Sequence, residues 1–413
     1  MAELYENREE QEQVILVAVS VQDEISTEAS LDELAELVKT AGGVVAGRFV
    51  QNRQMADMAT YIGSGKTAEL RERIVECGAT GIVCDDELTP SQMNNLEREL
   101  ETKVMDRTMV ILDIFASRAS TREGQLQVEL AQLRYRSTHL IGMGSILSRQ
   151  GGGIGTRGPG EKKLEIDRRR IRERISRLKT ELEQVKTNRT VQRKRRMENG
   201  VPVVCIVGYT NAGKSTLLNR LTGSEVLSED KLFATLDPTT RSLELPDGQQ
   251  VLLTDTVGFI HKLPHHLIQA FRSTLEEARY SDYILHVVDA SNPRLDIQMH
   301  TVYETLRELE IAGRPVVTAF NKADREHIPE VLKDFQADIV YRISAKTGAG
   351  IEELLHGIGR MIRESRVYFE HLYAYQDAAR IAQIRKNGQV IEEEYREDGI
   401  LIRAFVDRRG NYV

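Results

Sequence analysis

The chain has 413 residues, of which 40% are hydrophobic and 29% charged, and its formal net charge is -7. This length exceeds what one hydrophobic core usually organises, so two or three domains are expected. The longest apolar runs are too short to span a bilayer, and the polar, acidic N-terminus lacks the features of a secretory signal. We therefore expect a cytoplasmic, monomeric protein without a transmembrane segment, with peripheral membrane association as an open alternative.

Residues 1–120 are predicted to form an N-terminal α/β domain with a parallel sheet, because strand-like and helix-like segments alternate. The strand-like runs lie at 14–21, 44–50, 81–85 and 109–116, and the helix-like stretches at 31–39, 66–76 and 90–100. Within this domain the string GSGKT at 63–67 looks like a phosphate loop. Only one residue separates its glycines, so we interpret it as a helix start, and the question of ATP binding here stays open.

Residues 121–199 are predicted to form a helical hairpin. Leu126, Leu130, Leu133 and Leu140 share one helical face, and the apolar residues Ile171, Ile175, Leu178, Leu182 and Val185 repeat four and three residues apart in a second helix,. Between them, residues 142–160 contain eight glycines, so we expect a long flexible loop at the tip,.

The α/β alternation returns at 200–365, and a small C-terminal module is expected at 366–413, with strand-like pieces at 389–397 and 399–408,. The central domain contains the string GYTNAGKS after an apolar strand and before a leucine-rich helix. Gly208 and Gly213 allow backbone amides to wrap phosphates, Lys214 reaches the outer phosphates, and Ser215 offers a hydroxyl to magnesium. This context predicts a phosphate loop in a Ras-like domain.

Three further motifs identify the nucleotide as GTP. DTVG at Asp255 to Gly258 follows a strand, placing a carboxylate near magnesium and a glycine near the outer phosphate,. NKAD at Asn321 to Asp324 ends another strand, where the aspartate can accept two N–H groups that guanine has and adenine lacks. SAK at Ser344 to Lys346 supplies a backbone amide for the guanine oxygen. An ATPase is the weaker alternative.

The segment LFATLDPTTR between these motifs should contain the mobile switch threonine that closes over magnesium and the outer phosphate,. Thr235 is our choice, with Thr239 and Thr240 as rivals. The residue after DTVG is Phe259, where many signalling GTPases carry the glutamine that orients water. Because phenylalanine has no donor or acceptor, we expect slow hydrolysis unless an ion or a partner completes the site.

These strings, together with YIGSGK at 61–66 and GGGIGTRGPGEKKLEIDRR at 151–169, resemble the HflX family of ribosome-associated GTPases, within the broad Era and Obg-like class. The resemblance covers nearly the whole chain. It implies binding to the large ribosomal subunit, GTP hydrolysis in response, and separation of stalled or dormant ribosomes into subunits. Ribosome splitting, rescue and recycling, under stress, are all candidates for the physiological task.

Carried over by motif, the resemblance gives catalytic roles to Lys214, Thr235 and Gly258, and magnesium ligation to Ser215 and Thr235. The residues expected to bind GTP are Gly208, Tyr209, Thr210, Asn211, Ala212, Gly213, Lys214, Ser215, Phe233, Ala234, Thr235, Leu236, Asp237, Asp255, Thr256, Val257, Gly258, Asn321, Lys322, Ala323, Asp324, Ser344, Ala345 and Lys346. In related GTPases an asparagine at the position of Asn211 helps hold K⁺; bracing of the loop is the equally open alternative.

The basic residues of the hairpin suggest an RNA partner. Residues 161–196 contain fifteen Lys and Arg against six Asp and Glu, although the whole chain is acidic. The arginines expected to contact ribosomal RNA are Arg149, Arg157, Arg168, Arg169 and Arg170. A solvated helix face with internal ion pairs is the alternative. The competing function is a regulatory GTPase switch that recruits a protein or membrane partner.

Overall fold

The computed structural model describes residues 11–21, 24–150, 159–198, 201–223, 232–233, 239–262, 264, 278–311 and 313–407. The first 182 residues, together with 231–233 and 261–271, belong to one compact unit, and the remaining chain belongs to a second. Among the helices of the described residues, none is long and apolar enough to cross a bilayer.

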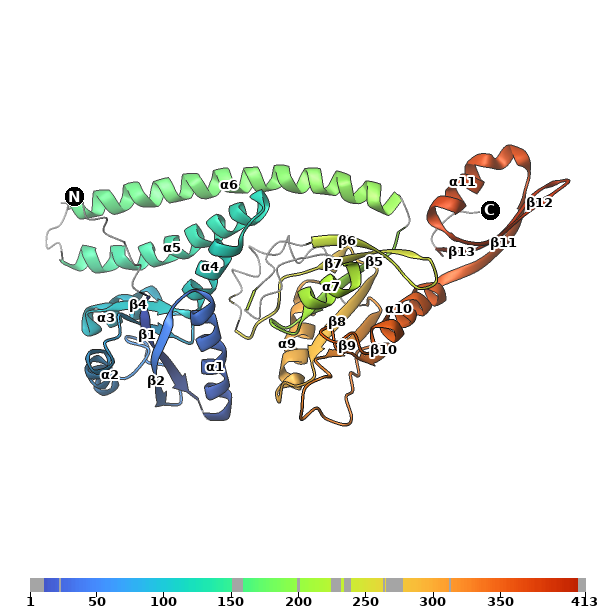
Figure 1. The fold of residues 1–413 in the computed structure, drawn as a ribbon. Helices are drawn as coiled ribbons and strands as arrows, with labels where there is room; N and C mark the ends of the chain where they lie inside the picture. The colour runs from blue at the N-terminus through green and yellow to red at the C-terminus, as the bar shows by residue number, and fades with distance from the viewer. Residues whose placement is uncertain are drawn as a thin grey trace, which may run out of the picture. The chain divides into compact units, whose positions relative to one another are not determined.

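The first unit contains a four-stranded parallel sheet with strand order β2-β1-β3-β4 (Figure 1). Helices α1 and α4 contact each other, as do α2 and α3, and the central strand β1 is buried along almost its whole length, as expected for a sheet covered on both faces,. The elements in chain order are β1 (Gln13–Ser20), α1 (Glu24–Thr40), β2 (Val44–Asn52), α2 (Ser64–Cys77), β3 (Gly81–Cys84), α3 (Pro90–Leu100), β4 (Lys103–Asp106) and α4 (Arg107–Arg118).

One predicted strand is wrong. The apolar run 109–116 forms the buried middle of helix α4, and the fourth strand is the preceding segment Lys103–Asp106. The Asp106 carboxylate accepts a hydrogen bond from the backbone N–H of Met109 at 2.9 Å and so caps the start of the helix,. A short apolar run fits a buried helix as well as a buried strand, so the capping aspartate is the signal that distinguishes them.

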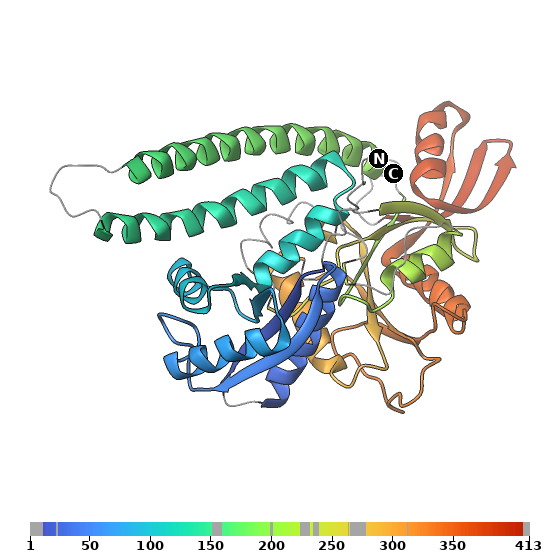
Figure 2. The ribbon, with the colours of Figure 1, turned by 60° about the vertical axis from the view of Figure 1, so that its left-hand side comes forward.

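Helices α5 (Arg122–Gln150) and α6 (Pro159–Glu198) lie side by side and form the predicted hairpin (Figures 1 and 2). Leu126 and Leu130 of α5 and Leu178 and Leu182 of α6 are buried. Arg174 of α6 donates to both carboxylate oxygens of Glu129 in α5, at 2.7 and 2.8 Å. The expected loop is much shorter than predicted, because α5 continues through Gly142 and Gly144 to Gln150.

The central part of the second unit is a six-stranded sheet with order β10-β9-β8-β5-β7-β6, in which only the pairing of β6 with β7 is antiparallel. Its buried strands and the helices α7 and α10 enclose one apolar core. The elements are β5 (Val203–Gly208), α7 (Lys214–Thr222), β6 (Thr239–Glu244), β7 (Gln250–Asp255), β8 (Tyr283–Asp289), α9 (Leu295–Glu308), β9 (Val316–Asn321), β10 (Ile339–Arg342) and α10 (Ile351–Ser365).

The C-terminal residues form a separate three-stranded antiparallel sheet with order β11-β13-β12, and α11 packs on one of its faces (Figure 1). Its elements are β11 (Arg366–Tyr373), a 3₁₀ turn η1 (Tyr375–Asp377), α11 (Ala378–Asn387), β12 (Gln389–Arg396) and β13 (Gly399–Asp407). The two predicted strands are confirmed as β12 and β13. Strand β11 and helix α11 were not predicted.

Candidate functional site

The phosphate loop begins where β5 ends and finishes at the first residue of α7. Gly213 precedes the helix with φ of +93°, a left-handed conformation that favours glycine,. A Cβ atom at Gly213 would also overlap the side-chain amide of Asn321. The buried Lys214 ammonium donates to the backbone carbonyls of Gly208 and Tyr209, at 3.0 and 2.8 Å. Lysine and loop are therefore held together as one compact structure.

A buried ammonium group, a hydroxyl and a carboxylate lie together at the start of α7. Burial lowers the pKa of Lys214 to about 8, although the Asp255 carboxylate partly opposes this shift. The hydroxyl of Ser215 donates to Oδ2 of Asp255 at 3.1 Å, and Asp255, the last residue of β7, is fully buried. The structure thus brings together the predicted cation, hydroxyl and carboxylate from two adjacent parallel strands and one helix.

The segment after Asp255 lies directly against the phosphate loop. The Thr256 hydroxyl donates to the carbonyl of Ile206 at 2.8 Å. The backbone N–H of Thr210 donates to the Phe259 carbonyl at 2.7 Å, and the Phe259 N–H donates to the Gly208 carbonyl at 3.1 Å. These bonds place Val257 and Gly258 beside the loop, as expected for a segment that senses the outer phosphate.

The predicted guanine motifs meet at the same edge of the sheet, because Asn321 ends β9 and the SAK turn follows β10. Asn321 donates through Nδ2 to the carbonyl of Ala212 at 2.8 Å and accepts through Oδ1 from the N–H of Ala345 at 2.9 Å. The Ser344 hydroxyl donates to Asp324 at 2.6 Å, and this bond lowers the pKa of the exposed Asp324 carboxyl. Asp324 is therefore charged at neutral pH and oriented toward solvent, with Ala323 before it and the exposed Lys346 nearby in the SAK turn.

Sequence reasoning missed one residue of this region. Asp289, the last residue of β8, forms an ion pair with Lys322 of the NKAD motif, with Nζ and Oδ2 2.7 Å apart and both side chains largely buried. Lys322 has φ of +64°, an uncommon conformation for a residue other than glycine,. The available signal was an aspartate at the end of a buried parallel strand, the edge where ligands bind in such sheets.

Part of the predicted switch lies outside the described residues, namely Ala234, Thr235, Leu236 and Asp237. Phe233 is described and is buried, with φ of +54°. The rival threonines both belong to strand β6, and the hydroxyls of Thr240 and Thr254 are 3.0 Å apart. Since Thr239 and Thr240 are committed to the sheet, Thr235 stays our prediction for the switch threonine.

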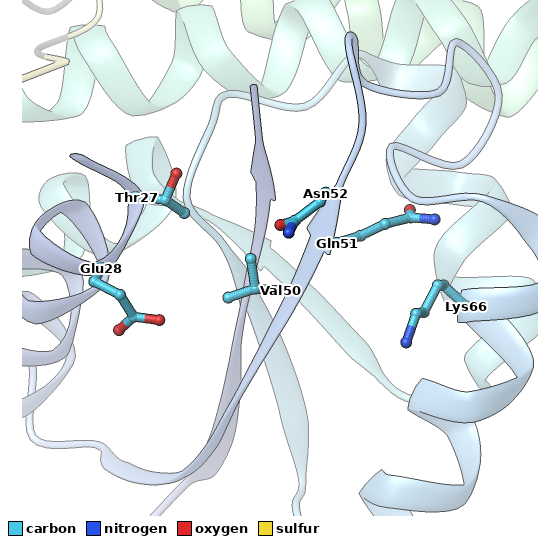
Figure 3. Close-up of a pocket in the computed structure, with 6 residues that line it drawn as sticks. All are labelled: Thr27, Glu28, Val50, Gln51, Asn52 and Lys66. Carbon is cyan, nitrogen blue, oxygen red and sulfur yellow. The ribbon is translucent and has the colours of Figure 1, made fainter. Parts of the chain in front are cut away.

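The GSGKT string of the N-terminal domain is a helix start, as predicted. The N–H of Gly63, which an anion would need, donates to Oε1 of Gln51 at 2.8 Å, and the Lys66 ammonium pairs with Glu69 at 2.6 Å. An open cavity of about 530 Å³ lies beside it, lined by Thr27 and Glu28 of α1, Val50, Gln51 and Asn52 of β2, and Lys66 of α2 (Figure 3). Its charged groups are already balanced by neighbours, so we assign no nucleotide to it.

The arginines expected to contact RNA differ in their placement. Arg149 lies in the last turn of α5, not in a loop, and Arg157 lies outside the described residues. Arg168 donates to the backbone carbonyl of Leu140 at 2.7 Å, so it also braces the hairpin. Arg169 is 82% exposed and pairs with Glu173, whereas Arg170 is exposed. RNA contact through these residues stays a prediction.

Taken with the sheet order, the phosphate loop, the Ser215–Asp255 pair and the guanine motifs define the class of protein: it is a P-loop GTPase, which binds guanine nucleotides and hydrolyses GTP to GDP and phosphate,. Family models agree along the chain. A model described as GTP-binding GTPase N-terminal matches residues 28–116, GTP-binding GTPase Middle Region matches 118–196, and 50S ribosome-binding GTPase matches 203–322.

The chain belongs to the HflX family of GTPases. It is 63% identical over 406 residues to GTPase HflX of Lacrimispora saccharolytica, covering 98% of this chain and 96% of the relative. Against GTPase HflX of Escherichia coli (strain K12) the identity is 43% over 357 residues, covering 84% and 82%. A solved structure described as an SsGBP and GDP complex aligns with a TM-score of 0.48 and 25% identity, covering 85% of this chain and 98% of that one.

Proposed function

We propose that this protein is a cytoplasmic, monomeric GTPase that binds the large ribosomal subunit and couples GTP binding and hydrolysis to ribosome splitting, rescue or recycling. The observation that carries the proposal is the match of residues 203–322 to a family model described as 50S ribosome-binding GTPase, within a chain related to HflX proteins along nearly its whole length. A charged surface on the hairpin supports it.

That surface lies on helix α6. Arg170, Arg172 and Arg177 are exposed, and among the described residues none of the three has an ion-pair partner within 4 Å. Arg168 and Arg174, in contrast, are used to hold α6 against α5. Free guanidinium groups on a rigid helix suit the phosphates of structured RNA, whose recognition depends mainly on backbone and shape.

In this proposal the nucleotide occupies the loop Gly208–Ser215, with guanine held by Asn321–Asp324 and Ser344–Lys346 and the outer phosphate sensed by Asp255–Gly258. The donor set fits Mg²⁺, because the Ser215 hydroxyl and the buried Asp255 carboxylate lie 3.1 Å apart and both offer oxygen,. Ser215 and Thr235 would ligate the ion, which would offset charge on the phosphates. Lys214 would hold the β- and γ-phosphates.

The test measures co-sedimentation with purified large subunits, in a non-hydrolysable GTP analogue and in GDP, across a salt series. We expect binding that is stronger with the analogue and weakens steeply with salt, and a GTP hydrolysis rate that rises on adding large subunits. Replacing Arg170, Arg172 and Arg177 by alanine should weaken binding. The matched control replaces Arg71, Arg73 and Arg98, which lie in α2 and α3. Equal loss in both triple variants, or hydrolysis indifferent to subunits, would contradict the proposal.

A further inference from the structure

The GTPase site lacks the usual side chain for positioning the attacking water. The residue after Gly258 is Phe259, whose ring has no hydrogen-bonding group and is 2% exposed. Its backbone is occupied as well, since its N–H and carbonyl bond to Gly208 and Thr210 of the phosphate loop. Any water-positioning group supplied by this part of the chain must therefore come from another residue beside Gly258.

Thr210, the third residue of the phosphate loop, lies beside Gly258 and carries a hydroxyl that no described residue bonds. Its side chain is buried, with 6% of the residue exposed, and its Oγ1 has no hydrogen-bond partner among the residues that the structure describes. Its backbone N–H donates to the carbonyl of Phe259. Buried hydroxyls are normally paired, and leaving one unpaired destabilises a fold. A valine would fill the same volume without that cost.

The location of this hydroxyl connects it with the chemistry. A Cβ atom built on Gly258 would lie 2.8 Å from Cγ2 of Thr210 and 3.0 Å from Nζ of Lys214. Thr210, Gly258 and Lys214 thus converge on one point. In a phosphate loop the lysine marks the outer phosphates, and the glycine of the DTVG motif marks the γ-phosphate. The Thr210 side chain consequently lies beside the place where the γ-phosphate meets the loop, with its methyl group nearest Gly258 and its hydroxyl on the same Cβ atom.

We propose that the Thr210 hydroxyl is a catalytic group that positions the attacking water at the γ-phosphate, in place of the side chain that Phe259 cannot provide. The water oxygen forms a bond to the γ-phosphorus, the bond to the β–γ bridging oxygen breaks, and the water proton passes to the released phosphate. Thr210 accepts a hydrogen bond from the water, donates one to a γ-oxygen, and ends unchanged. This inference rests on the placement of GTP in the phosphate loop proposed above.

The experiment is single-turnover GTP hydrolysis by the full chain without ribosomes, alongside affinities for GDP and GTPγS. Thr210→Val, which keeps the volume and removes the hydroxyl, should slow hydrolysis about tenfold, as expected for one lost transition-state hydrogen bond. Both affinities should stay close to wild type. Thr210→Ser should restore most of the rate. The matched control is Thr301→Val, which removes an exposed hydroxyl that bonds its own helix α9.

Three results would overturn the proposal: wild-type hydrolysis by Thr210→Val, equal slowing in the valine and serine variants, or slowing that is fully explained by weaker binding. If Thr210→Val does not fold by circular dichroism, Thr210→Ala provides the second variant without a hydroxyl. Failure of the nucleotide placement would look different, because Lys214→Ala would then bind and hydrolyse GTP like wild type. Failure of the ribosome proposal would leave these ribosome-free rates unchanged.

Discussion

The side-chain amide of Asn321 donates to the carbonyl of Ala212 at 2.8 Å, while its oxygen accepts from the N–H of Ala345 at 2.9 Å. One buried side chain therefore connects the phosphate loop, the guanine motif and the SAK turn. The same side chain leaves no room for a Cβ atom at Gly213. In the proposed nucleotide placement, Asn321 thus connects the segment that binds the base with the segment that binds the phosphates.

Asn321→Ala should consequently destabilise the domain and weaken binding of both GDP and GTP. The substitution leaves a buried carbonyl and a buried N–H without partners, and each such group costs about 1–3 kcal/mol, so we expect a loss of about 2–6 kcal/mol in unfolding free energy. Denaturant unfolding followed by circular dichroism measures it. Asn95→Ala is the control, because its bond to Ala59 is exposed to solvent. An equal loss in both variants would refute the linking role.

Asp324→Asn should change which base is preferred. The Ser344 hydroxyl fixes one carboxylate oxygen of Asp324 at 2.6 Å. In the proposed nucleotide placement the carboxylate accepts from the ring N–H and the exocyclic amine of guanine. In the asparagine variant, an NH₂ group replaces one carboxylate oxygen and meets a guanine N–H, so two donors face each other. GTP affinity should therefore fall about a hundredfold, which corresponds to the loss of one charge-assisted hydrogen bond. Xanthosine nucleotides, which carry an oxygen in place of the amine, should gain. Competition assays with labelled GDP decide it, and unchanged GTP affinity would contradict the assignment.

Potassium dependence tests the two interpretations of Asn211. Asn211 is exposed and has φ of +58°, which suits a tight turn and also leaves its side chain accessible,. If its amide oxygen helps hold K⁺, replacing K⁺ with Na⁺ should slow turnover severalfold, and Asn211→Gly should remove the difference. Glycine adopts the same φ freely, so it preserves the turn while removing the ligand. Equal wild-type rates in both salts would leave Asn211 as a structural residue.

Acid should destabilise the second unit through His286, which is 1% exposed in β8. Burial lowers the pKa of His286, against the opposing effect of Asp334, whose Oδ2 lies 3.7 Å from Nδ1. Burial would raise the pKa of Asp334, but the nearby His286 ring and the hydrogen bonds donated by Thr318 and Tyr303, each at 2.6 Å, outweigh it and lower this pKa to about 2. The native state thus holds a neutral imidazole beside a charged carboxylate.

The direction of the change in stability with pH follows from which state, native or unfolded, binds more protons. Below about pH 6.5 the unfolded chain protonates its histidine while the native state resists, so stability falls, by at most about 1.4 kcal/mol per pH unit for one proton. Asp334 contributes stability above about pH 3.8 that is lost as pH falls through about 2. Thermal unfolding between about pH 7.5 and pH 5 should show a smaller decrease for His286→Phe than for wild type. His300→Gln, on the surface of α9, should match wild type; equal slopes in all three proteins would exclude His286 as the cause.

Features of the site that are encoded in a short contiguous motif are predicted from the sequence, whereas features that depend on residues distant in the chain are not. The phosphate loop, DTVG, NKAD and SAK strings each place a short motif at the end of a strand, and the structure brings them together at one sheet edge. Asp289 was missed because its role depends on Lys322, which is distant in the chain and adjacent only after β8 and β9 pair. A single aspartate after an apolar run does not indicate which distant residue it will pair with.

The other errors have physical causes as well. The run 109–116 is apolar enough for a strand. It forms a helix because Asp106 caps the first turn and because the apolar side chains cover a face of the sheet. Gly142 and Gly144 each cost a helix about 1 kcal/mol relative to alanine, and the longer helix-favouring sequence around them overrides that penalty. Strand β11 was missed because its sequence RVYFEHLY continues directly from α10 without a turn signal.

The tip of the hairpin should separate ribosome action from nucleotide chemistry. It contains Arg149 at the end of α5 and Arg157 within residues 151–158, and it carries no nucleotide motif. Replacing residues 151–158 by an inert linker of equal length, or changing Arg149 and Arg157 to alanine, keeps both helices and all GTPase motifs. GTP affinity should therefore stay unchanged, whereas separation of ribosomes into subunits should fail.

The physical reason is reach: a glycine-rich tip can pass between RNA helices and bring arginines to phosphates, whereas the two-helix stem is too wide. Binding to large subunits should weaken without being lost, because the exposed arginines of α6 remain. Sucrose gradients measure subunit separation, beside GTP hydrolysis with large subunits, for wild type and both variants. The control is Arg134→Ala and Arg136→Ala in the middle of α5, which removes two positive charges away from the tip. If the tip variants split ribosomes as well as this control does, the tip is only a connector between α5 and α6, and RNA contact must lie on the stem.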